Sequence, residues 1–139
     1  MFTKILVPVD LTDSNRAAIE VASQLASRED GSVTLLHVIE AIADTEFEDM
    51  KDFYQRLEEK ARSAMVDLAA PLTLKGKQVD QQITYGNRAR KIVGYADEHD
   101  TDLIVLSSRQ IDPEQPEKTW TSISHQVAVL ARCPVLLVK

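Results

Sequence analysis

The sequence is poor in glycine, cysteine and aromatic residues. Its 139 residues include four glycines and one cysteine, and 5% of them are aromatic. The single cysteine, Cys133, excludes an internal disulfide and fits a reducing cytoplasm. Because Cys133 directly precedes the last apolar run, we interpret it as a packed thiol and not as a redox group. All four glycines lie before residue 95, so the last third of the chain has no glycine with which to build a phosphate-binding loop.

An excess of positive charge and long apolar runs are missing as well. The net charge of -6 weighs against non-specific binding to nucleic acid or to an anionic membrane. No apolar run approaches the roughly 20 residues of a membrane span. The first residues lack the apolar region and the cleavage site of a signal peptide. We therefore expect a cytoplasmic protein with no nucleic-acid partner and no membrane partner.

Short apolar runs rich in Val, Ile and Leu alternate with helical patterns along the chain. Runs of this kind are typical of strands buried on both faces of a parallel sheet. They occupy residues 4–9, 32–39, 102–107 and 134–139. A more polar run with alternating apolar positions, 79–85, predicts a third strand that is less buried.

Helical stripes fill the intervals between these runs. The longest stripe begins at Phe47, continues to Leu68 and should end near Pro71. The resulting β-α-β-α-β-α-β-α-β order, without a linker or a repeat, predicts one three-layer α/β domain over residues 1–139. The loop that follows residue 107 leaves the carboxyl end of the fourth strand, where open α/β sheets bind their ligands.

Four segments of the chain occur in a characteristic order: Lys4–Asp10, Leu35–Ile39, Asp102–Leu106 and Cys133–Lys139. In this order they resemble the strands of the universal stress proteins. The resemblance covers nearly the whole chain and implies a five-stranded parallel sheet in the order 3-2-1-4-5. This fold is Rossmann-like, or adenine nucleotide alpha hydrolase-like. The resemblance also implies a cytoplasmic stress-response protein that is commonly a homodimer.

One branch of that family binds ATP through a pattern similar to Gly-x2-Gly-x9-Gly-Ser/Thr after the fourth strand. Here Ser107, Gln110 and Thr121 stand where the glycines would fall, and only Ser122 keeps the Ser/Thr place. The resemblance therefore implies a degenerate nucleotide-binding site and no cofactor. By the same resemblance, the adenine end of the pocket is lined by Pro8, Val9, Asp10, Val38 and Leu106. Val9, Val38 and Leu106 would be apolar in any such sheet, and Asp10 could simply form a turn.

Catalytic and metal sites are poorly supported. Ser122, Ser124, His125 and Asp10 supply the residue types of a catalytic triad, but no Gly-x-Ser-x-Gly elbow is present. The three histidines have no paired spacing that would suit a metal. Arg88 and Arg109 could rim the nucleotide cleft and meet an anion, although solvated surface positions suit them better. We expect no catalytic residue, no metal and no enzymatic activity.

Two functions remain open. The first, which the glycine count favours, is a stress protein that acts by interaction with an unknown protein partner. The second is a protein that binds ATP or AMP through a rebuilt loop after the fourth strand. In either case we expect a homodimer through the last strand, by Val135, Leu136, Leu137 and Val138, because this strand is an apolar sheet edge. The loop 111–120 is the alternative cover for that edge.

Overall fold

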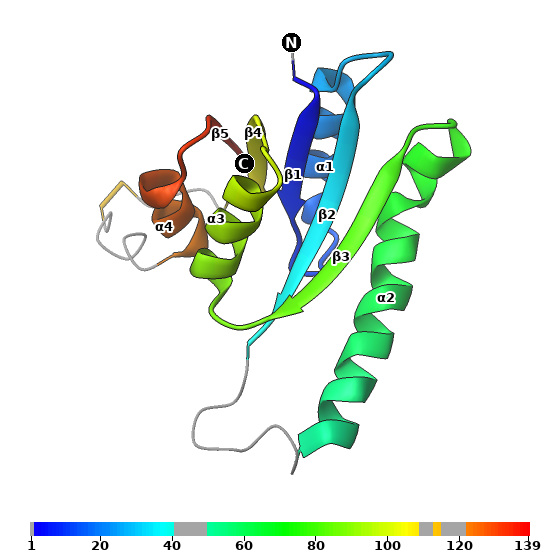
Figure 1. The fold of residues 1–139 in the computed structure, drawn as a ribbon, viewed down its shortest axis with the longest axis vertical. Coiled ribbons are helices and arrows are strands. Elements are labelled where there is room, and N and C mark those ends of the chain that lie inside the picture. The colour runs from blue at the N-terminus through cyan, green and yellow to red at the C-terminus, as the bar shows by residue number, and fades with distance from the viewer. Residues whose placement is uncertain (1, 41–49, 109–112, 115–121) are drawn as a thin grey trace.

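The computed structural model describes residues 2–40, 50–108, 113–114 and 122–139. Five parallel strands form one sheet in the order β3-β2-β1-β4-β5, as predicted. Four helices alternate with them (Figure 1). In chain order the elements are β1 (Lys4–Pro8), α1 (Asn15–Leu25), β2 (Ser32–Ile39), α2 (Lys51–Leu74), β3 (Val79–Tyr85), α3 (Arg88–Glu98), β4 (Leu103–Ser107), α4 (Ile123–Leu130) and β5 (Val135–Val138).

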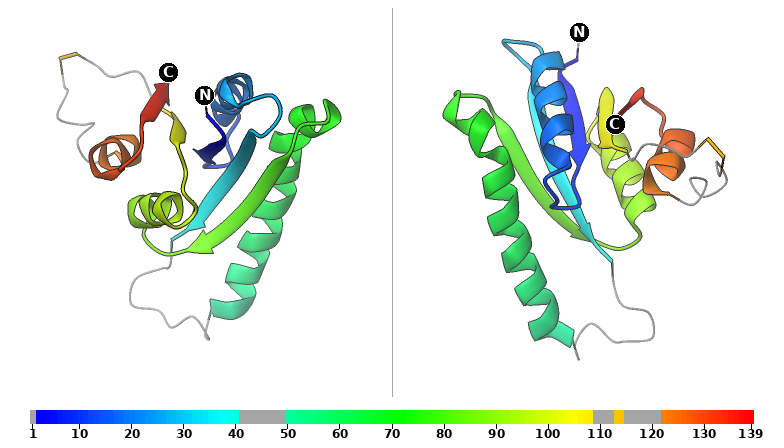
Figure 2. Two further views of the ribbon diagram at one scale, coloured as in Figure 1. Left: turned by 45° about the horizontal axis from the view of Figure 1, so that its top comes forward. Right: turned by 180° about the vertical axis from the view of Figure 1, so that it is seen from behind.

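The helices cover both faces of the sheet and give it three layers (Figure 2). Successive side chains of a strand point to opposite faces. In β1, β2 and β4, odd-numbered residues such as Ile5, Leu35 and Val105 pack with α1 and α2, whereas even-numbered residues such as Leu6 and Leu36 pack with α3 and α4. Both faces of β1, β2 and β4 are therefore buried, which explains their continuous apolar sequences. The outer strand β3 is less buried, as its alternating sequence predicted.

Helix α2 does not end near Pro71, and that prediction is wrong. The helix continues to Leu74 with Pro71 inside it. Proline removes one helical hydrogen bond and usually ends or kinks a helix. Here Leu68, Ala69 and Leu72, on both sides of the proline, are buried against the sheet. Burial of these three side chains stabilises the helix by about 25 cal/mol for each Å² of apolar surface removed from water. This gain offsets the missing hydrogen bond. Phe47 lies outside the described residues.

A tyrosine joins α2 to the outer strand β3. The hydroxyl of Tyr85 donates a 2.6 Å hydrogen bond to Glu58 Oε2, while Arg62 pairs with the other carboxylate oxygen. The Tyr85 ring also meets the buried Tyr54 ring edge to face, with centroids 6.0 Å apart. Burial and the nearby carboxylate raise the pKa of Tyr85 to about 12. The phenol is therefore neutral and acts as a donor at physiological pH.

Asp102 holds the start of the central strand β1 next to β4, which comes much later in the sequence. Asp102, just before β4, accepts hydrogen bonds from the backbone N–H groups of Thr3 (2.9 Å) and Lys4 (3.2 Å) and from the Thr3 hydroxyl (3.0 Å). These contacts align the amino ends of β1 and β4.

At their carboxyl ends β1 and β4 separate. Their registered pairs stop at Leu6 and Ile104, and β1 ends at Pro8, one residue earlier than predicted. Pro8 has no N–H to offer a ladder, and Val9 N–H turns to Leu36 O of β2 at 2.9 Å. From β1 the chain builds the sheet first to one side, as β2 and β3, and then to the other side, as β4 and β5. The gap between β1 and β4 is therefore the topological switch point of the sheet.

No helix in the described part of the chain is long and apolar enough to cross a membrane.

Candidate functional site

A cleft of about 1210 Å³ opens where β1 and β4 separate. Its walls come from the carboxyl ends of these strands, the loop between β1 and α1, and the first turn of α4. All seven residues predicted for the nucleotide site line it: Pro8, Val9, Asp10, Val38, Leu106, Ser107 and Ser122. The sheet order alone brings these residues together, since the carboxyl ends of parallel strands share one edge.

The apolar wall of the cleft is packed without a ligand. Val9, Val38 and Leu106 are only 6%, 3% and 5% exposed, and Pro8 is buried too. His37 Nδ1 donates to the carbonyl of Val9 at 2.9 Å and holds the end of β1 in place. These apolar side chains therefore serve the core whether or not the cleft is occupied.

Asp10 builds the turn that follows β1. Its Oδ1 accepts the backbone N–H of Thr12 at 3.0 Å and the Thr12 hydroxyl at 2.6 Å. Leu11 between them has a φ of +70°, a left-handed conformation that is uncommon for a residue other than glycine. Burial raises the pKa of Asp10, but the Thr12 hydrogen bonds and the positive charge of Arg88 outweigh it and hold that pKa below its ordinary value. Asp10 is thus an ionised turn residue at the rim of the cleft.

Asn15 is a site residue that the sequence reasoning missed. Its side chain is 2% exposed, accepts Asp10 N–H at 3.1 Å and donates to Ser107 Oγ at 3.2 Å. Ser107 in turn donates to the backbone carbonyl of Ser14 at 3.3 Å. The Ser107 hydroxyl therefore bridges β4 and the chain that follows β1. A signal was present: Asn15 precedes the buried Ala18 and Ile19 by three and four residues and extends their helical stripe.

Ser122 is the N-cap of α4. Its Oγ accepts the backbone N–H of His125 at 3.2 Å and lies 3.3 Å from Ser124 Oγ. This bond satisfies one of the free N–H groups of the first turn. Ser122 and His125 lie on the same helical turn, where the Ser122 hydroxyl binds the His125 backbone and not its ring, while Asp10 accepts its hydrogen bonds from Thr12. Arg88 lines the cleft; Arg109, Gln110 and Thr121 lie outside the described residues, as does the loop 111–120 except for residues 113 and 114.

The residues predicted for the dimer interface form the edge strand β5. Val135 and Leu137 pack toward α3 and α4, and Val138 packs on the opposite face. Leu136 is 37% exposed. Helix α4 adds two exposed apolar side chains, Val129 at 69% and Leu130 at 54%. In the described part of the chain no cluster of three or more His, Cys, Asp or Glu could hold a metal ion.

Comparison with known proteins identifies the class that this fold and cleft define. Residues 1–139 match the Universal stress protein family, and the chain belongs to it. The chain is 28% identical to universal stress protein YxiE of Bacillus subtilis, with 100% of both chains covered. The structure of UspA from Lactobacillus plantarum is similar, with a TM-score of 0.75, 25% identity and coverage of 99% and 98%. The fold is also that of a universal stress protein from Archaeoglobus fulgidus in complex with dAMP, with a TM-score of 0.70, 22% identity and coverage of 99% and 98%.

Proposed function

We propose that this universal stress protein acts in the cytoplasm as a dimeric stress-response protein, through contacts with another protein and without ATP or catalysis. The observation that carries this proposal is Ser107. A glycine at this position would let the backbone approach a phosphate. Ser107 instead places a side chain there, and its hydroxyl is engaged by Asn15 and by the carbonyl of Ser14.

The charges that line the cleft give a triphosphate no net attraction. Asp10 is ionised and Asp13 lines the same cleft, and Arg88 and Lys139 supply two opposing positive charges. Arg16 pairs with Asp13 at 3.3 Å. A triphosphate carries several negative charges, and a lining whose charges cancel does little to offset them.

A thermal-shift titration with ATP, with and without Mg²⁺, tests the proposal. A ligand at 100 times its dissociation constant stabilises a protein by about 2.7 kcal/mol, which is easily measured. We expect millimolar ATP to raise the melting temperature little. A large shift, or adenine nucleotide that co-purifies with the protein, would contradict the degenerate site. Glycine at Ser107, Gln110 and Thr121, with a loop one residue shorter, should raise ATP affinity, and Ser107→Gly alone is the matched control.

A second candidate function is the binding of an adenosine monophosphate. Two observations favour it: the cleft stays open, and the cation Arg88 lies on its wall. The relative from Archaeoglobus fulgidus forms a complex with dAMP. A monophosphate needs fewer backbone donors than a triphosphate, so the missing glycines would hinder it less. AMP should then stabilise the wild type, and Arg88→Gln should remove the effect. An AMP shift that Arg88→Gln leaves unchanged would place the phosphate elsewhere.

The proposed dimer uses the outer edge of β5. Among the described strands β5 pairs with β4 alone, and exposed apolar residues of α4 adjoin it in sequence. Leu136→Asp is the informative variant because Leu137 packs into the core of its own subunit. Light scattering should give a dimer for the wild type and a monomer for Leu136→Asp. Leu74→Asp, at an 87% exposed position on α2, should remain dimeric. A monomeric wild type at tens of micromolar, or a dimeric Leu136→Asp, would overturn this interface.

A further inference from the structure

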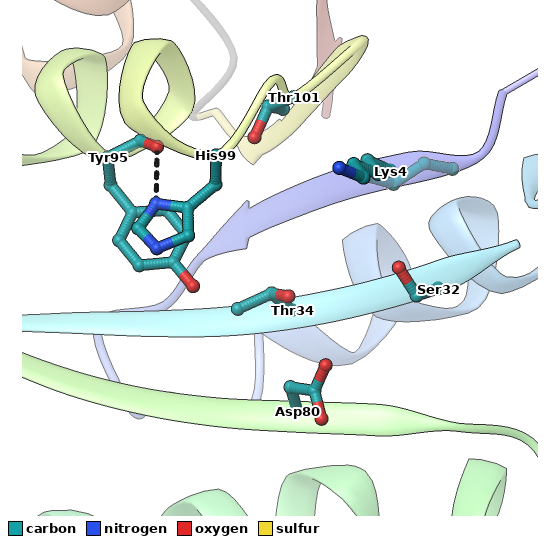
Figure 3. A pocket seen from close by; sticks show the side chains of 8 residues that line it. Lys4, Ser32, Thr34, Asp80, Tyr95, His99 and Thr101 are labelled. Carbon is teal, nitrogen blue, oxygen red and sulfur yellow. Dashed lines mark hydrogen bonds between the residues drawn. The ribbon is translucent and has the colours of Figure 1, made fainter.

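A second recess, of about 180 Å³, lies at the amino ends of the strands, at the opposite end of the sheet from the cleft. Its position follows from where α3 ends. The even-numbered face of the sheet is covered by α3 only as far as Glu98, and beyond that point its side chains are polar. The recess is lined by Lys4, Ile5, Ser32, Thr34, Asp80, Tyr95, His99 and Thr101 (Figure 3).

The recess holds one cation and one anion that do not pair with each other. Lys4 begins β1, and Asp80 lies near the start of β3, with β2 between them. The ion pairs within the described part of the chain involve neither residue. Two opposite charges are thus held apart across a small concave surface, each open to a partner of the opposite sign.

An aromatic pair forms one wall between these charges. The rings of Tyr95 and His99 stack with centroids 3.8 Å apart and an interplanar angle of 15°. His99 Nδ1 lies 3.0 Å from the carbonyl of Tyr95. A carbonyl can only accept, so Nδ1 donates this hydrogen bond. Figure 3 shows the phenol oxygen directed toward Thr34 and away from the backbone of α3.

Apart from the apolar Ile5, the remaining lining residues carry hydroxyls. Ser32, Thr34 and Thr101 can each donate and accept, and Tyr95 adds a phenol. Burial raises the pKa of Tyr95, with the Thr34 hydroxyl lowering it and the Asp80 charge raising it, so the phenol stays protonated.

We propose that this recess binds a small zwitterion of the α-amino-acid class, with its ammonium group at Asp80 and its carboxylate at Lys4. A ligand with one charge would neutralise one side and leave the other unpaired, whereas a zwitterion satisfies both. The volume suits this class: at about 30 Å³ per water molecule, the recess holds about six waters, close to the size of a small amino acid. A nucleotide is too large. The inference is independent of the function proposed for the cleft.

Isothermal titration calorimetry of the wild-type protein with the proteinogenic amino acids tests this proposal. Propionate and ethylamine serve as probes, since each keeps one charge of alanine and lacks the other. We expect at least one amino acid to bind, and both single-charge probes to bind at least about tenfold more weakly than alanine or the best amino acid. A concentration of about 10 mM is a hundred times a dissociation constant of about 0.1 mM, so binding of that strength would be saturated. If no amino acid binds at this concentration, the proposal is overturned. Ethylamine or propionate binding as tightly as the amino acid would overturn it as well.

Two variants then locate the bound zwitterion. Lys4→Met and Asp80→Asn should each lower the affinity at least about tenfold, since each removes a charge-assisted contact. Lys60→Met and Asp67→Asn make the same changes at exposed positions on α2 and should leave the affinity unchanged. Circular dichroism confirms that each variant is folded. Binding that persists in Lys4→Met or in Asp80→Asn would place the amino acid elsewhere and refute the assignment.

Discussion

Replacing Asn15 by alanine should destabilise the protein through the hydrogen bonds at the base of the cleft. Asn15 is 2% exposed and holds both Asp10 N–H and Ser107 Oγ. Removing the side chain leaves Asp10 N–H without its acceptor, at a cost of about 1–3 kcal/mol. The lost bond to Ser107 adds about 0.5–1 kcal/mol, because that hydroxyl keeps the carbonyl of Ser14. We expect a decrease of about 2–3 kcal/mol in the free energy of unfolding.

Urea denaturation of a double-mutant cycle measures this contribution. Ser107→Ala alone should cost about 1 kcal/mol. The double variant should lose less than the sum of the single variants, by a coupling of about 0.5–1.5 kcal/mol. Gln24→Ala, which removes an exposed hydrogen bond to Glu20 on the same helix, is the control and should change stability by less than about 0.5 kcal/mol. Strict additivity of the two cleft variants would refute a direct bond between Asn15 and Ser107.

Three further predictions concern the scaffold. Because the pKa of Tyr85 is raised from 10.0 to about 12, the contribution of this phenol to stability is complete below pH 10 and is lost as the pH rises through 12. In urea denaturation at a series of pH values, Tyr85→Phe should therefore show a smaller alkaline loss of stability than the wild type. An unchanged alkaline loss would contradict the hydrogen bond to Glu58. Gly31→Ala should destabilise by about 1–3 kcal/mol, since a Cβ there would lie 2.3 Å from the carbonyl oxygen of Ser27, and a neutral effect in thermal melts would argue against this tight turn. Asp102→Ala should cost about 1–3 kcal/mol and speed hydrogen exchange at the start of β1, whereas unchanged protection there would show that the aspartate does not hold the strand.

Apolar patterning predicted the strands because burial on both faces leaves a continuous run of Val, Ile and Leu. It failed at Pro71, where the local preference of proline is outweighed by tertiary packing of the residues around it. Asn15 escaped notice because a polar residue within a helical stripe reads as surface until its partners are known. Family resemblance predicted the positions of the cleft residues, since they follow directly from sheet order.

The second recess had no sequence signal. Lys4, Asp80 and Thr101 are single polar residues in three different segments; Asp80 and Thr101 form part of no motif, and Lys4 only begins the apolar run of the first strand. Only the parallel arrangement of the strands brings their amino ends together. The stacking of His99 on Tyr95 depends likewise on where α3 ends. Such a site becomes visible only once the sheet has been assembled.

The central place of β1 has a consequence for the newborn chain. The hydrogen bond from Thr3 to Asp102 joins residues 99 positions apart, and β4 follows Asp102 directly. At ribosomal rates of about 5–20 residues per second, about 5–20 s pass between the synthesis of β1 and the synthesis of β4, the later of its two neighbours. During that interval the strand at the centre of the finished sheet is an apolar edge, open to pairing with other nascent chains. Until β4 is made, β1 can therefore complete only the half of its pairing that β2 supplies.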